Sequence, residues 1–179
     1  MKFDGKVALI TGGGGGIGRA TAVGFAERGA KVFIVDNDAA SAQATVGVVR
    51  QGGGDAQCIQ ADVTTAAETN KYVQACLAAY GRIDCFFNNA GIEGKMNPMP
   101  DYEEDAFDRV MAVNVKGVFL GMKYVLPPML AQGLGTIVNT ASTAALFGTS
   151  GMIAYIGSKH AVLGMTKSAA IDVARKGIR

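Results

Sequence analysis

The stretch KVALITGGGGGIG, residues 6–18, decides the fold of this chain. Its first part, Lys6–Thr11, predicts a β-strand, and the helical pattern of Ile17–Arg28 predicts the helix that follows. Glycines between a strand and a helix permit a tight turn and let a pyrophosphate approach the backbone, beside the N–H donors of the helix N-terminus. A flexible turn is the alternative, because five consecutive glycines satisfy several known spacings at once. The position between a strand and a helix favours a dinucleotide-binding loop.

Downstream of this unit, β-rich runs alternate with helical patterns. We expect strands at Lys31–Asp36, Ala56–Gln60, Ile83–Asn88 and Gly135–Ala141, and helices at Ala39–Gln51, Thr65–Tyr80, Glu103–Leu130 and Met152–Lys176. Pro127-Pro128 should bend or end the long helix that contains them. Such alternation predicts a single α/β domain over residues 1–179, a Rossmann-like, doubly wound parallel sheet with helices on both faces.

Composition excludes several classes of protein. The chain has 179 residues, 49% of them hydrophobic, and a net charge of +2 without a basic block, so we expect neither disorder nor nucleic-acid binding. The longest early apolar run, Val7–Ile10, is too short for a signal or a membrane span, which predicts a soluble, cytoplasmic protein. Cys58, Cys76 and Cys85 are interpreted as reduced core residues, and His160, the only histidine, as structural. We expect no metal site.

Asp36 ends the second predicted strand and is a candidate ligand for a nucleotide ribose. A carboxylate at this position accepts hydrogen bonds from the ribose hydroxyls and repels a 2′-phosphate. Neither Gly15 nor Asn37 supplies a cation that would hold such a phosphate. This pattern predicts NAD rather than NADP. Alternatively, Asp36 caps the next helix, a role that Asp38 could equally take.

Two further motifs follow predicted strands. Asp62-Val63 ends the third strand, and Asn88-Asn89-Ala90-Gly91 ends the fourth. Open α/β sheets bind ligands at the carboxyl edge, so both motifs are candidates for cofactor contact. Each motif alone could also be an ordinary loop or turn.

The last predicted helix contains the chemically sharpest pair. Tyr155 and Lys159 are four residues apart and therefore share one helix face. Lys159 lies within an apolar stripe, where an ammonium must extend to solvent or find a partner. An ammonium beside a phenol favours the phenolate, which suits a group that moves a proton. The alternative is a packed tyrosine next to a lysine that reaches solvent. Ser142, at the end of the preceding strand, completes the constellation.

Asn114 interrupts the apolar stripe of the long predicted helix. A buried amide needs hydrogen-bond partners. It could satisfy a neighbouring backbone group, or it could hold a water molecule in a proton relay. The sequence leaves both interpretations open.

Taken in order, these motifs resemble the short-chain dehydrogenase/reductase family over Phe3 to Arg179. Through this resemblance the catalytic tetrad consists of Asn114, Ser142, Tyr155 and Lys159, with Tyr155 to Lys159 matching Y-x-x-S-K. The implied cofactor-binding residues are Thr11, Gly12, Gly16, Ile17, Gly18, Asp36, Asp62, Val63, Asn88, Ala90, Gly91, Tyr155 and Lys159.

The resemblance also implies roles. Tyr155 is the general acid/base, Ser142 hydrogen-bonds the substrate oxygen, Lys159 holds the nicotinamide ribose and favours the phenolate, and Asn114 anchors the relay water. The family tends to form homodimers and homotetramers through the two long helices. We therefore expect an oxidoreductase that transfers a hydride between NAD(H) and a secondary alcohol or ketone, a small molecule whose identity the sequence does not give.

Two alternatives and one departure accompany this expectation. A nucleotide-sugar epimerase or dehydratase shares the tyrosine–lysine pair, although Asn88–Gly91 and Ser158 argue against it. A non-catalytic NAD-binding module is the second alternative. Complete family members continue beyond the last helix with a strand, a Pro-Gly turn and a substrate-covering segment, so we expect a fragment. In it Ile178 would start another strand, and Gly135–Ala141 would have an unpaired edge.

Overall fold

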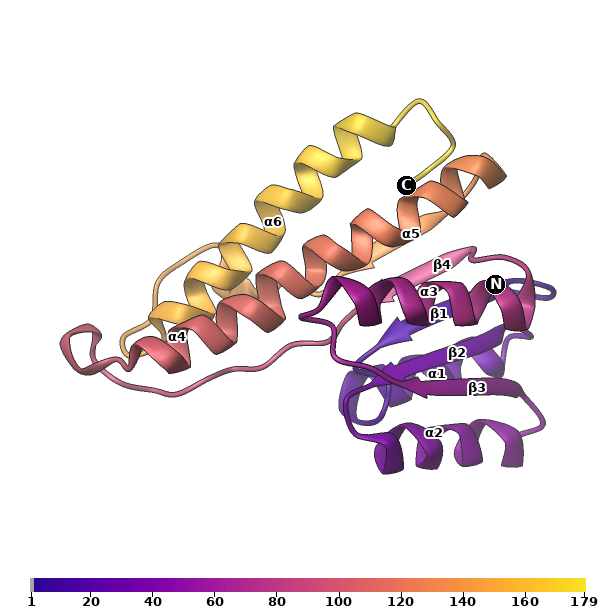
Figure 1. Ribbon diagram of the computed structural model, residues 1–179, viewed down its shortest axis with the longest axis horizontal. Coiled ribbons are helices and arrows are strands. Elements are labelled where there is room, and N and C mark those ends of the chain that lie inside the picture. Colours follow the sequence, from indigo (N-terminus) through magenta and orange to yellow (C-terminus); the bar gives the residue numbers. More distant parts are fainter. Residues whose placement is uncertain (1) are drawn as a thin grey trace.

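The computed structural model describes residues 2–179 and shows one parallel sheet with helices on both faces (Figure 1). In the order β3-β2-β1-β4-β5, the strands are β3 (Asp55–Gln60), β2 (Lys31–Asp36), β1 (Val7–Thr11), β4 (Cys85–Asn88) and β5 (Thr136–Asn139). The strand order reverses between β1 and β4, and at such a switch point the carboxyl ends of the strands leave a crevice. The predicted fold class is confirmed.

Two helices cover one face of the sheet and the remaining long helices cover the other (Figure 1). The helices are α1 (Gly16–Ala26), α2 (Ala39–Gln51), α3 (Ala66–Tyr80), α4 (Glu104–Met111), α5 (Val118–Gln132) and α6 (Ile153–Val173), with short 3-10 turns at Met99–Asp101 and Thr143–Ala145. Alternate residues of each central strand point to opposite faces, so Ile34 packs with α1 and α2, whereas Val35 packs with α3 and α5. Helix α6 lies against α5 through Val162 and Met122.

The long helix predicted over Glu103–Leu130 departs from expectation at one point. Pro127 and Pro128 lie inside α5, which continues to Gln132, so the prediction that they bend or end the helix is wrong about an end. The fixed φ of proline is compatible with helical geometry, so the helix can continue, although each proline lacks the N–H donor and its ring crowds the carbonyl four residues earlier. The irregular segment is instead a π-turn at Ala112–Gly117, between α4 and α5. Such turns widen a helix locally and are frequent at functional sites.

By length and composition alone, the segment Glu104–Gln132 could cross a membrane. Core helices of soluble proteins pass the same test. Val118 and Val125 of this segment are buried against the sheet and its neighbouring helices. Its packing is that of a core helix.

The outer edge of β5 is partly covered, which corrects the expectation of an unpaired edge. Ile178 pairs in parallel with Gly135. The N–H of Ile137 donates to the carbonyl of Arg179 at 2.8 Å, and the N–H of Arg179 donates to the carbonyl of Gly135 at 2.9 Å. The predicted strand start at Ile178 therefore exists as a first pairing beside β5. Val138, further along the strand, remains 53% exposed.

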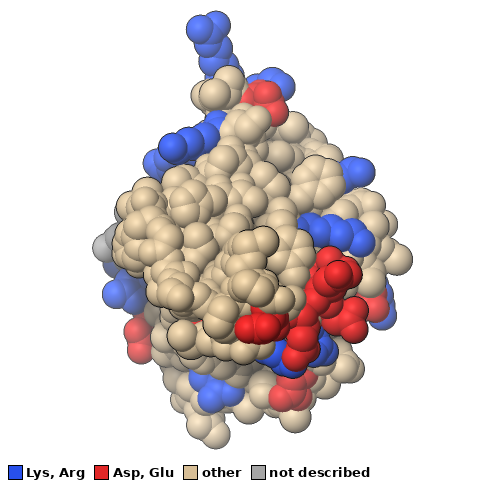
Figure 2. Space-filling view, turned by 90° about the vertical axis from the view of Figure 1, so that its left-hand side faces the viewer, with Lys and Arg blue, Asp and Glu red and all other residues tan. Residues whose placement is uncertain are grey.

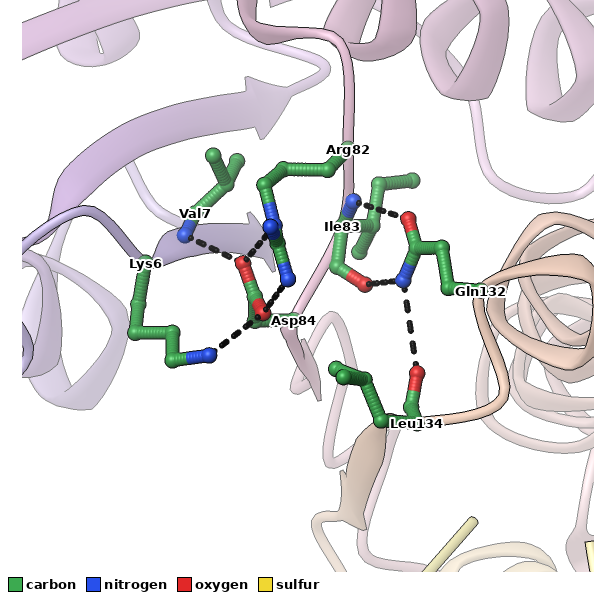
Figure 3. Close-up of polar contacts among 7 residues, drawn as sticks. All are labelled: Lys6, Val7, Arg82, Ile83, Asp84, Gln132 and Leu134. Atoms are coloured by element: carbon green, nitrogen blue, oxygen red, sulfur yellow. Dashed lines mark hydrogen bonds and ion pairs between the residues drawn. The ribbon is translucent and has the colours of Figure 1, made fainter. Parts of the chain in front are cut away.

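A buried carboxylate ties the amino ends of β1 and β4 together (Figure 3). Asp84 is 4% exposed and accepts hydrogen bonds from Lys6 at 3.2 Å, from the Val7 N–H at 3.0 Å, and from Arg82 at 2.6 and 2.8 Å. Burial would raise the pKa of this carboxyl, but the bonds from Arg82, Val7 and Lys6 outweigh burial and hold the pKa below its usual value.

Gln132, at the end of α5, fastens the same edge (Figure 3). Its side chain accepts from the Ile83 N–H at 3.1 Å and donates to the carbonyls of Ile83 at 2.8 Å and Leu134 at 3.3 Å. These bonds fix the chain segments before β4 and β5, at the edge of the sheet opposite the crevice. The amino ends of both strands are thereby held in place relative to α5.

Candidate active site

A cleft of about 650 Å³ runs along the carboxyl ends of the strands. This volume lies within the roughly 300–1,000 Å³ typical of ligand sites. Its lining consists of Gly12, Gly15, Gly16, Ile17, Asp36, Asn37, Ala61, Asp62, Val63, Asn89, Ala90, Gly91, Ile92, Glu93, Val113, Thr140, Tyr155 and Lys159. One cleft thus contains residues predicted from the glycine run at the start of the chain together with residues predicted from the last helix.

The glycine loop is shaped by backbone that other residues would strain. Gly12 and Gly16 have positive φ angles of 63° and 48°, which favour glycine. A Cβ on Gly12 would lie 3.0 Å from the Cα of Ala90, and a Cβ on Gly18 would overlap the carbonyl oxygen of Gly12. Gly12 and Gly16 line the cleft, whereas Gly18 acts beneath it by allowing close packing of α1 on the loop.

The N-terminus of α1 faces open space. Among the residues that the structure describes, no side chain caps α1, whereas Asp38 caps α2 and Thr65 caps α3. A Cβ on Gly15 or Gly16 would meet no atom within 4 Å. Uncapped N–H groups and the partial positive charge of a helix N-terminus form an anion site. The loop therefore has room and N–H donors for a pyrophosphate, and its contact with one stays a prediction.

Asp36 lines the cleft and does not cap α2. Its carboxylate accepts from the Gly14 N–H at 2.8 Å and the Asp38 N–H at 3.1 Å, and Asp38 itself caps the helix. The guanidinium of Arg19, the cation nearest to the glycine run in sequence, donates to Thr45 at 2.9 Å and to the Gly14 carbonyl. It is therefore engaged outside the cleft, which leaves an acidic group to meet a ribose.

Asp62 and Val63 line the adjoining wall. The carboxylate of Asp62 accepts from the Thr64 N–H at 2.8 Å, and this bond closes a turn around Val63. Val63 packs against Gly117 in the π-turn, where a Cβ would lie 3.0 Å from the valine methyl carbon. An apolar side chain at this position suits the flat face of a base.

Two predicted cofactor residues support the cleft from behind. Asn88 is buried and donates to the carbonyl of Val118 at 2.9 Å and to the side chain of Asn139 at 3.0 Å. The hydroxyl of Thr11 accepts from the N–H groups of Asn89 at 3.0 Å and Ala90 at 3.1 Å. Both residues hold neighbouring strand ends in register, and within residues 2–179 neither belongs to the cleft lining.

Lys159 is 4% exposed and does not reach solvent. Its ammonium donates to the carbonyl of Thr140 at 2.8 Å and lies 5.6 Å from the ring centroid of Tyr155. A Cβ on Gly91 would lie 3.6 Å from the ammonium nitrogen. Burial lowers the pKa of Lys159. The structure thus shows a buried Lys159 whose hydrogen-bond partner is the Thr140 carbonyl, and its predicted effect on Tyr155 stays a prediction.

Asn114, in the π-turn, is fully buried. Its oxygen accepts from the Ile92 N–H at 2.8 Å, and its amide donates to the Ile92 carbonyl at 2.8 Å and to the Ser158 hydroxyl at 3.0 Å. Of the two interpretations left open by the sequence, satisfaction of a neighbouring backbone group is observed. The relay water stays a prediction.

Through its hydroxyl, Ser142 forms a local hydrogen bond and none with the other predicted tetrad residues in the described chain. Its hydroxyl accepts from the Ala144 N–H at 3.1 Å and caps the 3-10 turn after β5. Within the described chain, neither Ser142 nor Asn114 is part of the cleft lining, whereas Tyr155 and Lys159 are. The predicted contact of Ser142 with a substrate oxygen remains a prediction.

Asn89, which the sequence indicated only as a member of the N-N-A-G motif, and Thr140, which it did not indicate as a site residue, both line the cleft. The Asn89 amide donates to the carbonyls of Thr11 at 3.2 Å and Gly12 at 3.3 Å, and the Thr140 hydroxyl donates to the Asn89 side chain at 3.2 Å. These bonds link the glycine loop to the carbonyl that holds Lys159. The position of Asn89 inside N-N-A-G was the available signal; Thr140 carried none.

Two loops flank the start of α6, at the end of the molecule seen in Figure 2. The N–H of Asn97, after β4, donates to the carbonyl of Gly151, after β5, at 3.0 Å. Met96, Leu146 and Phe147 on these loops are exposed. Figure 2 shows a mostly uncharged surface here, with charged side chains gathered at its margins. The start of α6 thus borders a mostly uncharged surface.

Metal ligands are not gathered anywhere in the described part of the chain. Within residues 2–179, His, Cys, Asp and Glu side chains form no group of three or more that could hold a metal ion.

Comparison with known proteins identifies the relatives of this architecture. The family described as short chain dehydrogenase matches residues 6–179. Levodione reductase from Leifsonia aquatica is 44% identical over 99% of this chain and 67% of its own length. Cyclohexanol dehydrogenase from Acinetobacter sp. (strain SE19) is 40% identical over 99% of this chain and 71% of its own. The crystal structure of NAD+-bound xylitol dehydrogenase superposes with a TM-score of 0.98 at 41% identity, covering 100% of this chain and 69% of that one.

Proposed function

The chain belongs to the short-chain dehydrogenase family, and on that premise we propose that it transfers a hydride between NAD(H) and a secondary alcohol or its ketone. The names of two relatives, levodione reductase and cyclohexanol dehydrogenase, support a dehydrogenase or reductase reaction. An NAD+-bound xylitol dehydrogenase of nearly the same fold supports the cofactor.

One observation carries the proposal. A buried ammonium lies 5.6 Å from the ring of Tyr155, at the end of a cleft that begins at an uncapped helix N-terminus. A dinucleotide cradle leading to a phenol beside a cation is the arrangement that redox chemistry with proton transfer needs.

Each part of the cleft suits one part of the cofactor. The loop Gly12–Gly18 would hold the pyrophosphate, Asp36 the adenosine ribose, and Val63 one face of the adenine. Lys159 would hold the nicotinamide ribose. When bound, NAD supplies the carbon that accepts or returns the hydride.

Proton transfer falls to Tyr155. In alcohol oxidation the phenolate takes the hydroxyl proton while the carbon–hydrogen bond breaks and its electron pair leaves as hydride. In ketone reduction the phenol returns that proton to the forming alkoxide. The Lys159 ammonium, 5.6 Å from the centroid of the Tyr155 ring, would place a positive charge near the group that moves this proton. Ser142 would donate a hydrogen bond to the substrate oxygen as negative charge develops.

We extend the proposal to assembly and location. Helices α4–α5 and α6 carry Phe107, Phe119 and Ile171 with exposures of 38%, 48% and 81%. Apolar side chains on two long surface helices suit a homodimer or homotetramer interface. We place the protein in the cytoplasm, in keeping with its three unpaired cysteines. Sedimentation of the purified protein tests the assembly, and cell fractionation tests the location.

The test of the function is direct. Purified protein is titrated with NADH by calorimetry and then assayed with NAD and a panel of cyclic and linear secondary alcohols, following NADH absorbance. We expect saturable NADH binding and turnover with at least one secondary alcohol. Binding without any turnover across the panel would support a non-catalytic NAD-binding module instead.

A further inference from the structure

Three chain segments meet at the side chain of Asn114. They are the loop after β4, through Ile92, the π-turn itself, and helix α6, through Ser158. Asn114 and Ser158 are both 0% exposed. An asparagine amide has two hydrogens and one oxygen, and all three are used here. The amide is therefore a fixed junction rather than a mobile group.

Ser158 closes this junction onto the catalytic turn of α6. Its hydroxyl accepts from Asn114 at 3.0 Å and donates to the carbonyl of Tyr155 at 2.7 Å. Ser158 directly precedes Lys159 and lies outside the cleft lining of the described chain. A continuous chain of hydrogen bonds thus runs from Ile92, which lines the cleft, to Tyr155.

We propose that Ser158 is a positioning residue for the reaction, because it locks Asn114 and the cleft wall at Ile92 to the turn of α6 that carries Tyr155 and Lys159. The proposal rests on the proposed function, since the turn matters through the chemistry of Tyr155. Small displacements of reacting groups cost large factors in rate, so a loosened junction should lower turnover more than cofactor binding.

The same helix offers a matched control. The Thr166 hydroxyl donates to the Val162 carbonyl at 2.7 Å and accepts from the Asn139 amide at 3.0 Å. This pair has the bonding pattern of Asn114 and Ser158, but it joins α6 to β5 beyond the cleft. Removing either hydroxyl should affect stability similarly, and only removal at Ser158 should affect positioning.

The experiment compares Ser158→Ala, Ser158→Thr and Thr166→Val with the wild-type chain. For Ser158→Ala we expect kcat to fall about tenfold or more, with the KM for NAD changed by less than about twofold. Ser158→Thr should restore most of kcat, because a helical threonine hydroxyl can also bond the preceding turn. Thr166→Val should leave kcat within about twofold while shifting the unfolding midpoint as Ser158→Ala does.

A second readout does not depend on activity. In spectra of protein labelled with 15N on asparagine, the Asn114 side-chain amide, assigned with Asn114→Asp, should exchange with solvent faster in Ser158→Ala than in the wild type or in Ser158→Thr. Unchanged exchange, or an equal fall of kcat in Thr166→Val, would overturn the proposal. If the wild-type chain shows no turnover, the proposed function fails, and the exchange comparison still decides whether Ser158 locks Asn114.

Discussion

The two halves of the cleft are made of different materials. The phosphate half, Gly12–Gly18 with Asp36, is built from backbone conformation and one carboxylate, with space in front of an uncapped helix. The catalytic half, Asn114 with Tyr155 and Lys159, is built from buried polar side chains that bond across the fold. Cofactor binding therefore depends mainly on open space in front of the helix N-terminus, whereas proton transfer depends on polar side chains whose burial is energetically unfavourable.

This difference has an energetic consequence. Glycine adopts a positive φ without the steric strain that other residues would meet, so the conformation of the loop itself stores little strain. A lysine at 4% exposure is costly, because burial disfavours its charge. Substitution of a crowded loop glycine should thus lower stability and cofactor affinity together, whereas removal of the Tyr155 hydroxyl should lower turnover with little change in cofactor affinity.

The largest expected effect is a loss of turnover caused by a substitution in the catalytic half alone. Tyr155→Phe keeps the ring and its packing but removes the oxygen that moves the proton. Turnover should fall by roughly 10²- to 10⁴-fold, the usual worth of general acid/base catalysis, while NADH affinity changes little. Steady-state kinetics and calorimetry measure the two quantities. Retention of most activity would mean that another group moves the proton.

A second substitution breaks the phosphate half. The Cβ of Gly18→Ala would overlap the Gly12 carbonyl, so the loop must shift. The free energy of unfolding should fall by about 1–3 kcal/mol, and NADH affinity should fall with it. Gly15→Ala is the matched control, because its Cβ would meet no atom within 4 Å, and its stability should stay within about 0.5 kcal/mol of the wild type. Equal unfolding curves for the two variants would contradict the packing argument.

The arrangement of strands and helices followed from local pattern. The strands β1 and β2 are continuous apolar runs, as central parallel strands are, and helix α2 was predicted with its observed ends. The π-turn could not be predicted from local sequence, because the side chain of Asn114 within it forms its hydrogen bonds with residues far away in the chain. Asn114 bonds to Ile92, 22 positions away, and to Ser158, 44 positions away.

The site was predictable where residue type decides the role. Asp36, Tyr155 and Lys159 were recognised because a carboxylate, a phenol and an ammonium have distinct chemistry, and all three line the cleft. Thr140 was missed because it holds Lys159 through its backbone carbonyl, which any residue possesses. For Thr11 the structure adds a role that the sequence did not indicate, because its hydroxyl accepts from the Asn89 N–H after β4, and its predicted contact with the cofactor stays a prediction.

A third prediction sharpens the description of the phosphate half. With Asp36 in the lining and Arg19 engaged by Thr45, a 2′-phosphate would meet repulsion. NADH should bind at least about tenfold more tightly than NADPH, or about 1.4 kcal/mol. Asp36→Ala combined with Asn37→Arg should narrow or invert the gap. Calorimetry with both cofactors checks this, and equal affinity of the wild type for both would refute the role of Asp36.

The smallest expected effect has the opposite sign and tests the cost of the catalytic half. Burial lowers the Lys159 pKa in the folded chain, so the ammonium is unfavourable at every pH below the unfolded value of about 10.4. Lys159→Met fills the same space without charge, and water in the cleft can satisfy the Thr140 carbonyl. The variant should therefore be more stable at neutral pH by about 1 kcal/mol, although inactive. Denaturant unfolding measures this gain.

The pH dependence of that gain identifies its origin. The depressed pKa means that the cost is complete below the folded value and disappears as pH rises through the interval up to about 10.4. The advantage of Lys159→Met should accordingly shrink over this interval. Lys167→Met, on the exposed side of α6, is the control and should show no such trend. A variant at Lys159 that is less stable than the wild type at neutral pH would show that the ammonium strengthens the fold, and the contrast between the two halves would then be wrong.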